Sequence, residues 1–554
     1  MVSPKLSNAS VIHKPISAHS CVRCAERKVK CDRRQPCDAC MRHNVECIFR
    51  ELPPPRRRKK PTKEEILIAR LKLYESILQE KGIESQELPT QVSKTSGSGE
   101  KRDPDAGFVA NDMLQLLVYG EGRSKFLDND LWTRVIEEFR EPGDALGNSS
   151  DNDSEAEAEA VEKEDMDDSA GVVLSLSPVQ NSGRKCPHPP TDHILELWRI
   201  FLERINPLFR VVHVPTLQRA LQVAISNLKR IPRNLEAILF AIYSASVMSL
   251  DEHDCERRFG QSRKTLLSRY IQSTKVSLLR AKFMGTTDLV VLQAFLIYLL
   301  SVRHIYDSRT LWTLTGVAIR IGEGMGLHRD GTFLGLPPFE TEIRRRTWWE
   351  MKMLDQRTAY VSGSSIFDDV DMQGRTPKRP ANINDDELFP GMPSPPRESN
   401  KVTDMFFCAM RSEFKSFWIN YAARKRQQGK SDDLWDNYES RDEMKEKDTA
   451  IDELEQVLES KYVRYCDPSQ PIQLMAMLFA RFSISSMRFM VHHPRRWKHV
   501  QKISSSERQY VWDLSVKLLE QYNMPRTSPQ LKLFSWQVAF YFQWQAFIHV
   551  LDTL

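Results

Sequence analysis

Six cysteines lie close together near the N-terminus, and their spacing is repeated. The unit Cys-x2-Cys-x6-Cys occurs twice, as Cys21, Cys24, Cys31 and then Cys37, Cys40, Cys47. Thiolates are preferred ligands of structural zinc, which takes four of them in a tetrahedron. One zinc ion would leave two thiolates over, and two ions need eight ligand positions, which six cysteines supply only if two sulfurs are shared. Ligand counting therefore predicts two Zn2+ ions held by six thiolates.

A disulfide framework is the alternative use of clustered cysteines. The chain has ten cysteines, and the four outside the cluster are scattered. Residues 1–20 contain no continuous apolar run of the kind an export signal needs. We therefore expect a metal site in a reducing compartment. A module of about 27 residues has almost no apolar core, so zinc binding must supply its folding free energy.

The charge of the chain is unevenly distributed. Residues 1–63 contain 16 Lys and Arg against 5 Asp and Glu, whereas the whole chain has a net charge of +5. A basic arm on a mildly acidic body is typical of nucleic-acid binding. Zinc modules that bind proteins are the alternative, but their spacings differ and they usually include histidine. In the first half of the cluster, Arg23, Arg27, Lys28 and Lys30 should face outward, because the interior is metal.

The segments 21–32 (CVRCAERKVKCD) and 36–40 (PCDAC) resemble the fungal Zn2Cys6 binuclear cluster transcription regulators. The resemblance implies that Cys21 and Cys37 bridge the two ions, with Cys24 and Cys31 on one zinc and Cys40 and Cys47 on the other. It also implies that Arg27 and Lys28 reach CGG-type triplets in the major groove. Arg23 and Lys30 would then contact phosphates. The pair Ala25 and Glu26 departs from the family pattern, in which a further basic residue is common at this place.

A basic, proline-rich linker follows over residues 48–61. It contains Arg56, Arg57 and Arg58, continued by two lysines. Nothing apolar surrounds this run, so we expect it to serve nuclear import, phosphate binding or both.

Residues 62–82 have a helical pattern that begins at a capping box and ends at a glycine. Leu67, Leu71, Tyr74 and Leu78 step by four, three and four, which predicts a two-heptad coiled-coil seam and a homodimer. A second apolar row on the same segment, formed by Ile66, Leu73 and Ile77, favours the alternative that the helix packs on its own chain.

Residues 1–18 and most of 83–188 are expected to be disordered. Within the second segment, 108–140 has a mixed pattern that we interpret as two short helices. The tract 151–168 holds ten acidic residues and one lysine, too polar to form a core. We interpret it as a solvated spacer, with an acidic activation region as the alternative.

The region 189–554 has mainly helical periodicity and predicts a large all-α domain. Its longest apolar runs, 237–250 and 289–302, are too short to span a membrane and should be buried core helices. Leu311, Leu314, Ala318, Ile321 and Met325 share one helical face. The segments 311–330, 342–349 and 380–385 resemble the regulatory middle domain of the same fungal family, which implies an all-α regulatory fold.

Several polar features of this domain also lead to expectations. Arg344 to Arg346 should form buried ion pairs, with Glu340, Glu342 and Asp355 as nearby candidates, and a partner-facing basic patch is the alternative. Gly316 should allow two helices to approach closely. His492 and His493, just before Pro494, predict a turn.

The sequence contains no credible nucleophile–base arrangement. The tripeptide 328–330 (HRD) imitates a kinase catalytic loop, but the asparagine that this loop requires is a glycine here. We therefore predict a nuclear, sequence-specific RNA polymerase II transcription factor that binds double-stranded DNA and meets the transcription machinery. It would regulate a metabolic or secondary-metabolite pathway and respond to a small-molecule effector. In the rival hypothesis, a ligand-sensing or scaffolding body is merely tethered to chromatin by the zinc head.

Overall fold

The computed structural model describes residues 20–49, 106–111, 115–120, 122–127, 186–362, 375–428, 441–494 and 503–554. The chain divides into two units, Met1–Glu100 with the cysteine module (the head) and Lys101–Leu554 (the body). Arg56, Arg57 and Arg58, the expected seam at Leu67, Leu71, Tyr74 and Leu78, and the acidic tract lie outside the described residues.

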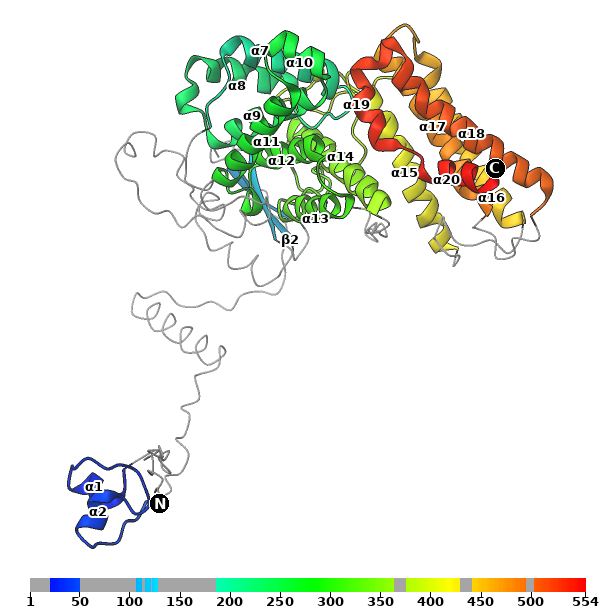
Figure 1. Cartoon of the computed structure of the whole chain (residues 1–554). Helices are drawn as coiled ribbons and strands as arrows, with labels where there is room; N and C mark the ends of the chain where they lie inside the picture. The colour runs from blue at the N-terminus through cyan, green and yellow to red at the C-terminus, as the bar shows by residue number, and fades with distance from the viewer. Residues whose placement is uncertain are drawn as a thin grey trace, which may run out of the picture. The chain divides into compact units, whose positions relative to one another are not determined.

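Residues 20–49, the described part of the head, contain two short helices, α1 (Val22–Glu26) and α2 (Asp38–Arg42), and each begins directly after a cysteine (Figure 1). Both helices end in the same way. Lys28 and Asn44 have left-handed backbone conformations, with φ of 54° and 46°. The next residue in each half then donates its N–H to a cysteine carbonyl, Val29 to Cys24 and Val45 to Cys40, each at 3.1 Å. The sequence repeat is therefore also a structural repeat.

The body is built mainly from helices. Its first part comprises α7 (Thr191–Ile200), η2 (Phe201–Ile205), α8 (Val214–Ser226), η3 (Leu228–Arg230), α9 (Arg233–Met248), α10 (Glu252–Phe259), α11 (Arg263–Arg280), η4 (Phe283–Gly285), α12 (Leu289–Val302), α13 (Ser308–Gly324) and α14 (Pro338–Ser362). Its second part comprises η5 (Asp385–Glu387), α15 (Phe406–Gln427), α16 (Arg441–Lys461), η6 (Val463–Tyr465), α17 (Pro471–His492), α18 (Ser505–Thr527), η9 (Pro529–Phe534), α19 (Ser535–Val538), η10 (Ala539–Tyr541) and α20 (Trp544–Thr553).

The core of the first part is formed by α9 and α12, which are apolar nearly all round. From Glu236 to Met248 every residue of α9 is buried, and in α12 only Val290 is not. These helices correspond to the two long apolar runs, so their prediction as core helices is confirmed. The predicted face of α13, from Leu311 to Ile321, is also buried.

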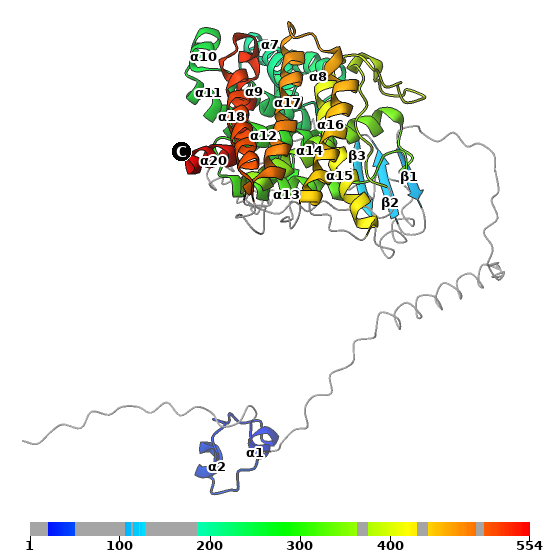
Figure 2. The ribbon, with the colours of Figure 1, turned by 90° about the vertical axis from the view of Figure 1, so that its right-hand side faces the viewer.

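Helices α15 to α18 pack beside one another and cover one side of the first part (Figures 1 and 2). Among the described helices, α17 alone is long and apolar enough to cross a membrane by length and composition. More than half of its apolar window is buried inside the body (56%), as in a core helix.

A three-stranded antiparallel sheet precedes the helices. It consists of β1 (Ala106–Asn111), β2 (Gln115–Gly120) and β3 (Arg123–Leu127) in the order β1-β2-β3. In the register Val118 is opposite both Phe108 and Lys125. The interpretation of 108–140 as two short helices is therefore wrong over these strands, and the expected disorder of 83–188 does not hold for them.

The sheet is anchored on the body through β3. The Ser124 amide donates to the Thr287 carbonyl at 2.8 Å, and its hydroxyl donates to the Met325 carbonyl at 3.0 Å. Leu117 and Phe126 pack against Leu334 and Leu336. These contacts bury apolar area that two isolated hairpins would leave in water, which explains why the strands form here.

The expectation for Gly316 is wrong, because a Cβ at this position would meet no atom within 4 Å. The close approach occurs two turns later in the same helix. A Cβ at Gly322 would lie 2.7 Å from the Met351 Cε of α14, so glycine leaves room there for the end of the Met351 side chain between α13 and α14.

His492 is the last residue of α17, rather than part of a turn, and it connects three helices. Its Nε2 lies 2.9 Å from the Asp448 Oδ1 of α16, and its Nδ1 lies 2.5 Å from the Glu507 Oε1 of α18. Burial opposes the charge of the imidazole, but the two carboxylates outweigh it and raise the pKa of His492.

This raised pKa predicts a pH dependence of stability. A histidine whose pKa is raised by folding stabilises the folded state fully at pH values below its ordinary pKa of ~6.5. This contribution disappears as the pH rises through the pKa of the folded state. We expect the urea midpoint of the body to fall as the pH rises from about 6 to 8, and His492→Gln to remove this dependence. His253→Gln, at an exposed histidine of α10, is the control. An unchanged pH profile in His492→Gln would contradict the assignment.

Candidate metal centre and nucleic-acid interface

The sulfur atoms of the head form two overlapping groups of four. One group contains Cys21, Cys24, Cys31 and Cys37, the other contains Cys21, Cys37, Cys40 and Cys47, and within each group all sulfurs lie within 4.8 Å of one another. The shared members are Cys21 and Cys37, which occupy the N-cap positions of α1 and α2. The helix starts thus position the two central sulfurs.

The distances between sulfurs fit tetrahedral zinc. The Cys21 Sγ lies 3.7 Å from the Cys37 Sγ and from the Cys40 Sγ, and the Cys24 Sγ lies 3.6 Å from the Cys37 Sγ. A tetrahedron with zinc–sulfur bonds of about 2.3 Å has sulfur–sulfur edges of roughly 3.8 Å. Two tetrahedra that share an edge would account for six sulfurs around two ions. The arrangement of the six cysteines therefore fits two zinc ions.

The ionisation of the thiols differs between shared and unshared cysteines. Burial raises the pKa of the Cys40 thiol to about 12 and also raises that of Cys24. Burial opposes ionisation of Cys21 and Cys37 as well, but hydrogen bonds from the amides of Cys24 and Cys40 outweigh it and lower both pKa values. The shared thiols of Cys21 and Cys37 are therefore more acidic than those of Cys24 and Cys40.

The basic side chains surround this metal centre on the outside. Arg23, Arg27, Lys28 and Lys30 are all exposed. The structural repeat shows how one-sided this charge is, because the positions equivalent to Arg27, Lys28 and Lys30 in the second half are His43, Asn44 and Glu46. The first repeat of the cysteine cluster, Cys21 to Cys31, is therefore more basic than the second, Cys37 to Cys47.

Three further exposed basic residues of the head were missed by sequence reasoning: Arg33, Arg34 and Arg42. Arg33 has a left-handed backbone with φ of 62°, and its amide donates to the Cys31 Sγ at 3.4 Å. The Arg42 side chain donates to the Asp38 carbonyl at 3.3 Å. Their charge was visible in the sequence, but their position in the loop and on α2 was not.

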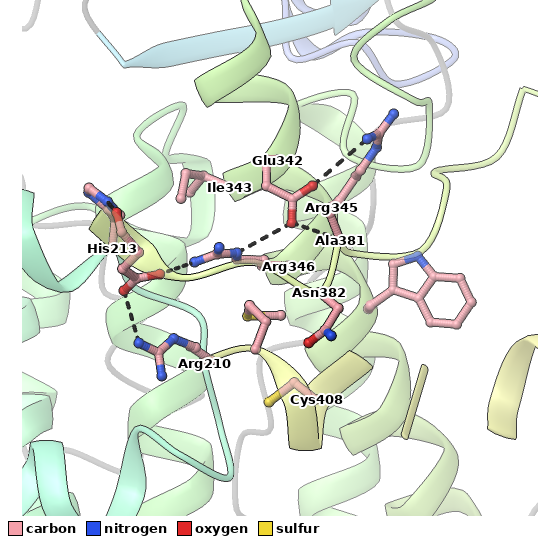
Figure 3. Close-up of polar contacts among 12 residues, drawn as sticks. Arg210, His213, Glu342, Ile343, Arg345, Arg346, Ala381, Asn382 and Cys408 are labelled. Atoms are coloured by element: carbon pink, nitrogen blue, oxygen red, sulfur yellow. Dashed lines mark hydrogen bonds and ion pairs between the residues drawn. The ribbon is translucent and has the colours of Figure 1, made fainter. Parts of the chain in front are cut away.

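In the body, the three consecutive arginines of α14 are used for internal contacts. Arg345 donates to both carboxylate oxygens of Asp330 at 2.8 Å, and Arg346 donates to the Asp385 Oδ1 at 2.6 Å. Glu342 lies between these two arginines, 3.8 Å from the Arg345 Nη1 and 3.4 Å from the Arg346 Nε (Figure 3). The expectation of buried ion pairs is confirmed, and Glu342 is one of the predicted partners.

Other details of the expected pairing are wrong. Asp355 accepts a hydrogen bond from the Thr315 hydroxyl at 2.9 Å and is not a partner of this arginine run in the structure. Arg344 instead donates to the Ser124 hydroxyl of β3 at 2.9 Å and to the Met325 carbonyl. Asp330, the acid of the kinase-like tripeptide, is fully buried and paired with Arg345, so its role is structural.

Together these features define a class of protein, in which a binuclear zinc–thiolate head with a basic face is joined to a large helical body. The fungal Zn(2)-Cys(6) binuclear cluster domain matches residues 19–57, and the fungal specific transcription factor domain matches residues 198–458.

Curated relatives match over most of the chain. The aurofusarin cluster transcription factor aurR2 of Gibberella zeae is 31% identical over 97% of this chain and 72% of its own length. The transcriptional regulator AacuB of Aspergillus aculeatus is 29% identical over 100% and 77%. The pyriculol/pyriculariol biosynthesis cluster transcription factor 1 of Pyricularia oryzae is 33% identical over 74% and 55%. The chain belongs to the fungal Zn2Cys6 transcription factors, a family of zinc-containing DNA-binding regulators and not a class of enzymes.

Proposed function

We propose that this chain acts in the nucleus as a sequence-specific regulator of RNA polymerase II transcription that reads CGG-type triplets in double-stranded DNA. The observation that supports the proposal most is the one-sided charge of the head. A fixed two-metal scaffold exposes Arg27, Lys28 and Lys30 on one half, whereas the equivalent positions of the other half carry no lysine or arginine.

The residues of the head have separate roles in this proposal. Cys21 and Cys37 would each bind both zinc ions, and the other four cysteines would bind one ion each. Arg27 and Lys28 donate to guanine O6 and N7, the commonest specific contact in the major groove. Arg23 and Lys30 neutralise phosphates, as do Arg56, Arg57 and Arg58, which also serve nuclear import.

The chain is proposed to act as a homodimer that binds paired triplets. The seam at Leu67, Leu71, Tyr74 and Leu78 is the basis for this part of the proposal. The linker between Cys47 and this seam would set the spacing of the two half-sites.

The proposed target is a set of secondary-metabolite genes. Two relatives are named for the aurofusarin cluster and for the pyriculol/pyriculariol biosynthesis cluster, and the match to the first covers nearly the whole chain. The body would relay a small-molecule effector to the transcription machinery.

The role of Lys28 can be tested by comparing two DNA duplexes, one with a CGG triplet and one with that triplet altered. We expect Lys28→Ala to weaken binding to the CGG duplex by about 5- to 150-fold, equivalent to ~1–3 kcal/mol for one base contact, with little change for the altered duplex. Kd values from fluorescence anisotropy measure this. Replacing Arg56, Arg57 and Arg58 by alanine should weaken binding to both duplexes equally. The slope of the logarithm of the binding constant against the logarithm of the salt concentration should become shallower by up to about 3.

Asn44→Ala is the matched control for Lys28→Ala. Asn44 has the equivalent left-handed position in the second half of the head, so this variant has a comparable backbone strain without the loss of charge. An equal loss for both duplexes in Lys28→Ala would mean that Lys28 contacts phosphate and does not read a base.

A further inference from the structure

A cavity of about 1140 Å3 lies in the body between α14, the segment 376–398 and the middle of α15, and the end of α13 and residues 328–336 also line it. Small-molecule sites in proteins usually have volumes of ~300–1000 Å3, so this cavity can hold a complete ligand of drug size. None of the DNA-binding or metal-binding roles proposed above uses it.

Two tryptophans of α14 form an aromatic wall of the cavity. The Trp349 indole N–H donates to the carbonyls of Pro377 at 3.2 Å and Lys378 at 2.9 Å, which fixes this ring against the opposite segment. Trp348 also lines the cavity and is only half-buried, so part of its surface is accessible. A half-buried indole offers a flat apolar surface on which an aromatic ring can stack.

Basic side chains outnumber acidic ones around the cavity. The acidic residues of the lining are Glu323, Glu342 and Glu398, and the basic ones are Arg329, Arg345, Lys352, Lys378, Arg379 and Lys415. All three acids already accept hydrogen bonds within the protein, Glu323 from Arg320, Glu342 from Arg346 and Glu398 from the Asn382 amide. Two of the basic residues are paired with acids outside the lining, Arg345 with Asp330 and Arg379 with Glu413. With these two acids counted, six basic residues stand against five acidic ones, so a small excess of positive charge remains and favours an anion.

Lys415 places one of these charges deep in the wall. Its side chain is 6% exposed, and its Nζ donates to the Lys352 carbonyl at 3.2 Å. A buried ammonium is costly to desolvate and gains strongly from a nearby anion, because the local dielectric is low. Lys378, in contrast, is exposed at the edge of the cavity.

From this combination we propose that the cavity binds a small planar aromatic acid, with its rings against Trp348 and its anionic group near Lys415 and Lys378. The proposal deepens the effector part of the proposed function, and its binding step does not depend on DNA. The same helix α14 carries Arg346, bonded to Asp385, and Arg344, bonded to the sheet, so a ligand in the cavity contacts the element that connects these parts of the body.

The full-length protein can be tested with two fluorescent probes that differ only in charge. Anilinonaphthalene sulfonate is an aromatic anion, and phenylnaphthylamine is the same ring system without the sulfonate. We expect one saturable site for the anion, with at least ten-fold higher affinity than for the neutral probe. Lys378→Met and Lys415→Met should each lower the affinity for the anionic probe by about 5- to 10-fold and leave the affinity for the neutral probe unchanged.

Lys517→Met, at an exposed lysine of α18, is the matched control and should bind both probes like the wild type. Lys378 is exposed, so its variant keeps the test valid if Lys415→Met fails to fold. Equal affinities for the two probes, or wild-type binding by both cavity variants, would overturn the proposal. DNA affinity is measured separately, because loss of probe discrimination with normal DNA binding refutes this inference alone, and the reverse result refutes the DNA-binding proposal alone.

Discussion

Replacing Cys37 with alanine is expected to remove both zinc ions from the head and to abolish DNA binding, with a loss of more than 100-fold in affinity. The Cys37 sulfur belongs to both groups of four, so its removal leaves three ligands around each ion. Structural zinc contributes ~10–16 kcal/mol to small modules of this kind, which are unfolded without it. Zinc content by mass spectrometry and Kd by anisotropy measure the effect.

Two further variants make the Cys37 experiment specific. Cys47→Ala removes a sulfur from only one group, so we expect it to retain roughly one zinc ion per chain. Cys466→Ala in the body should retain both ions, because this cysteine lies outside the cluster. Full zinc content and DNA affinity in Cys37→Ala would show that the assignment of shared sulfurs is wrong.

The second large effect is expected in the body, at Asp385. This carboxylate is 3% exposed and accepts hydrogen bonds from Arg346 at 2.6 Å, from Arg210 at 3.1 Å and from the Val214 amide at 3.2 Å. Replacing it with asparagine leaves two guanidinium groups without their common anion. Removing one partner of a buried ion pair typically costs ~3–5 kcal/mol, so we expect a loss of this size in the free energy of unfolding measured in urea.

The pH dependence gives an independent check of the Asp385 result. Burial opposes the charge of Asp385, but Arg346 and Arg210 outweigh it and lower its pKa to about 2. A carboxylate whose pKa is lowered by folding stabilises the folded state fully above its ordinary pKa of ~3.9. This contribution to the free energy of unfolding is lost as the pH falls through the folded-state value of about 2. The difference between the wild type and Asp385→Asn should therefore be constant near neutral pH and shrink in acid.

Asp386→Asn is the control for Asp385→Asn, because the neighbouring carboxylate is exposed. Exposed substitutions of this kind usually change stability by less than ~0.5 kcal/mol. If the two variants were equally stable, the ion pairs of Asp385 with Arg346 and Arg210 would not contribute to the stability of the body.

Much of this architecture follows from local patterns in the sequence. The cysteine spacing predicts two metals by counting ligands, and the runs within α9 and α12 predict core helices because nearly every residue is apolar. Both signals are contained in short windows of the chain.

The features that were not predicted depend on contacts between distant residues. Arg345 and Arg346 pair with Asp330, in the turn before α14, and with Asp385, at the start of the short helix η5 after α14. Helical periodicity gives no information about which of these distant segments meet. The strands of residues 106–127 are short and are stabilised by packing on a surface made more than 150 residues later. The cavity arises between the end of α13, the turn that follows it, α14, the segment 376–398 and α15, and it has no sequence signature of its own.

The contacts that anchor the sheet on the body also decide where the acidic tract lies in the order of the chain. Because β3 and α7 both belong to the body, the part of the chain between residues 127 and 191 begins and ends in the same unit. The covalent path from the cysteine cluster to the sheet is therefore residues 50–105, and the acidic tract at 151–168 is not part of this path. In chain order the tract is an insertion between two elements of the body, so its length does not change the number of residues that join the cluster to the sheet.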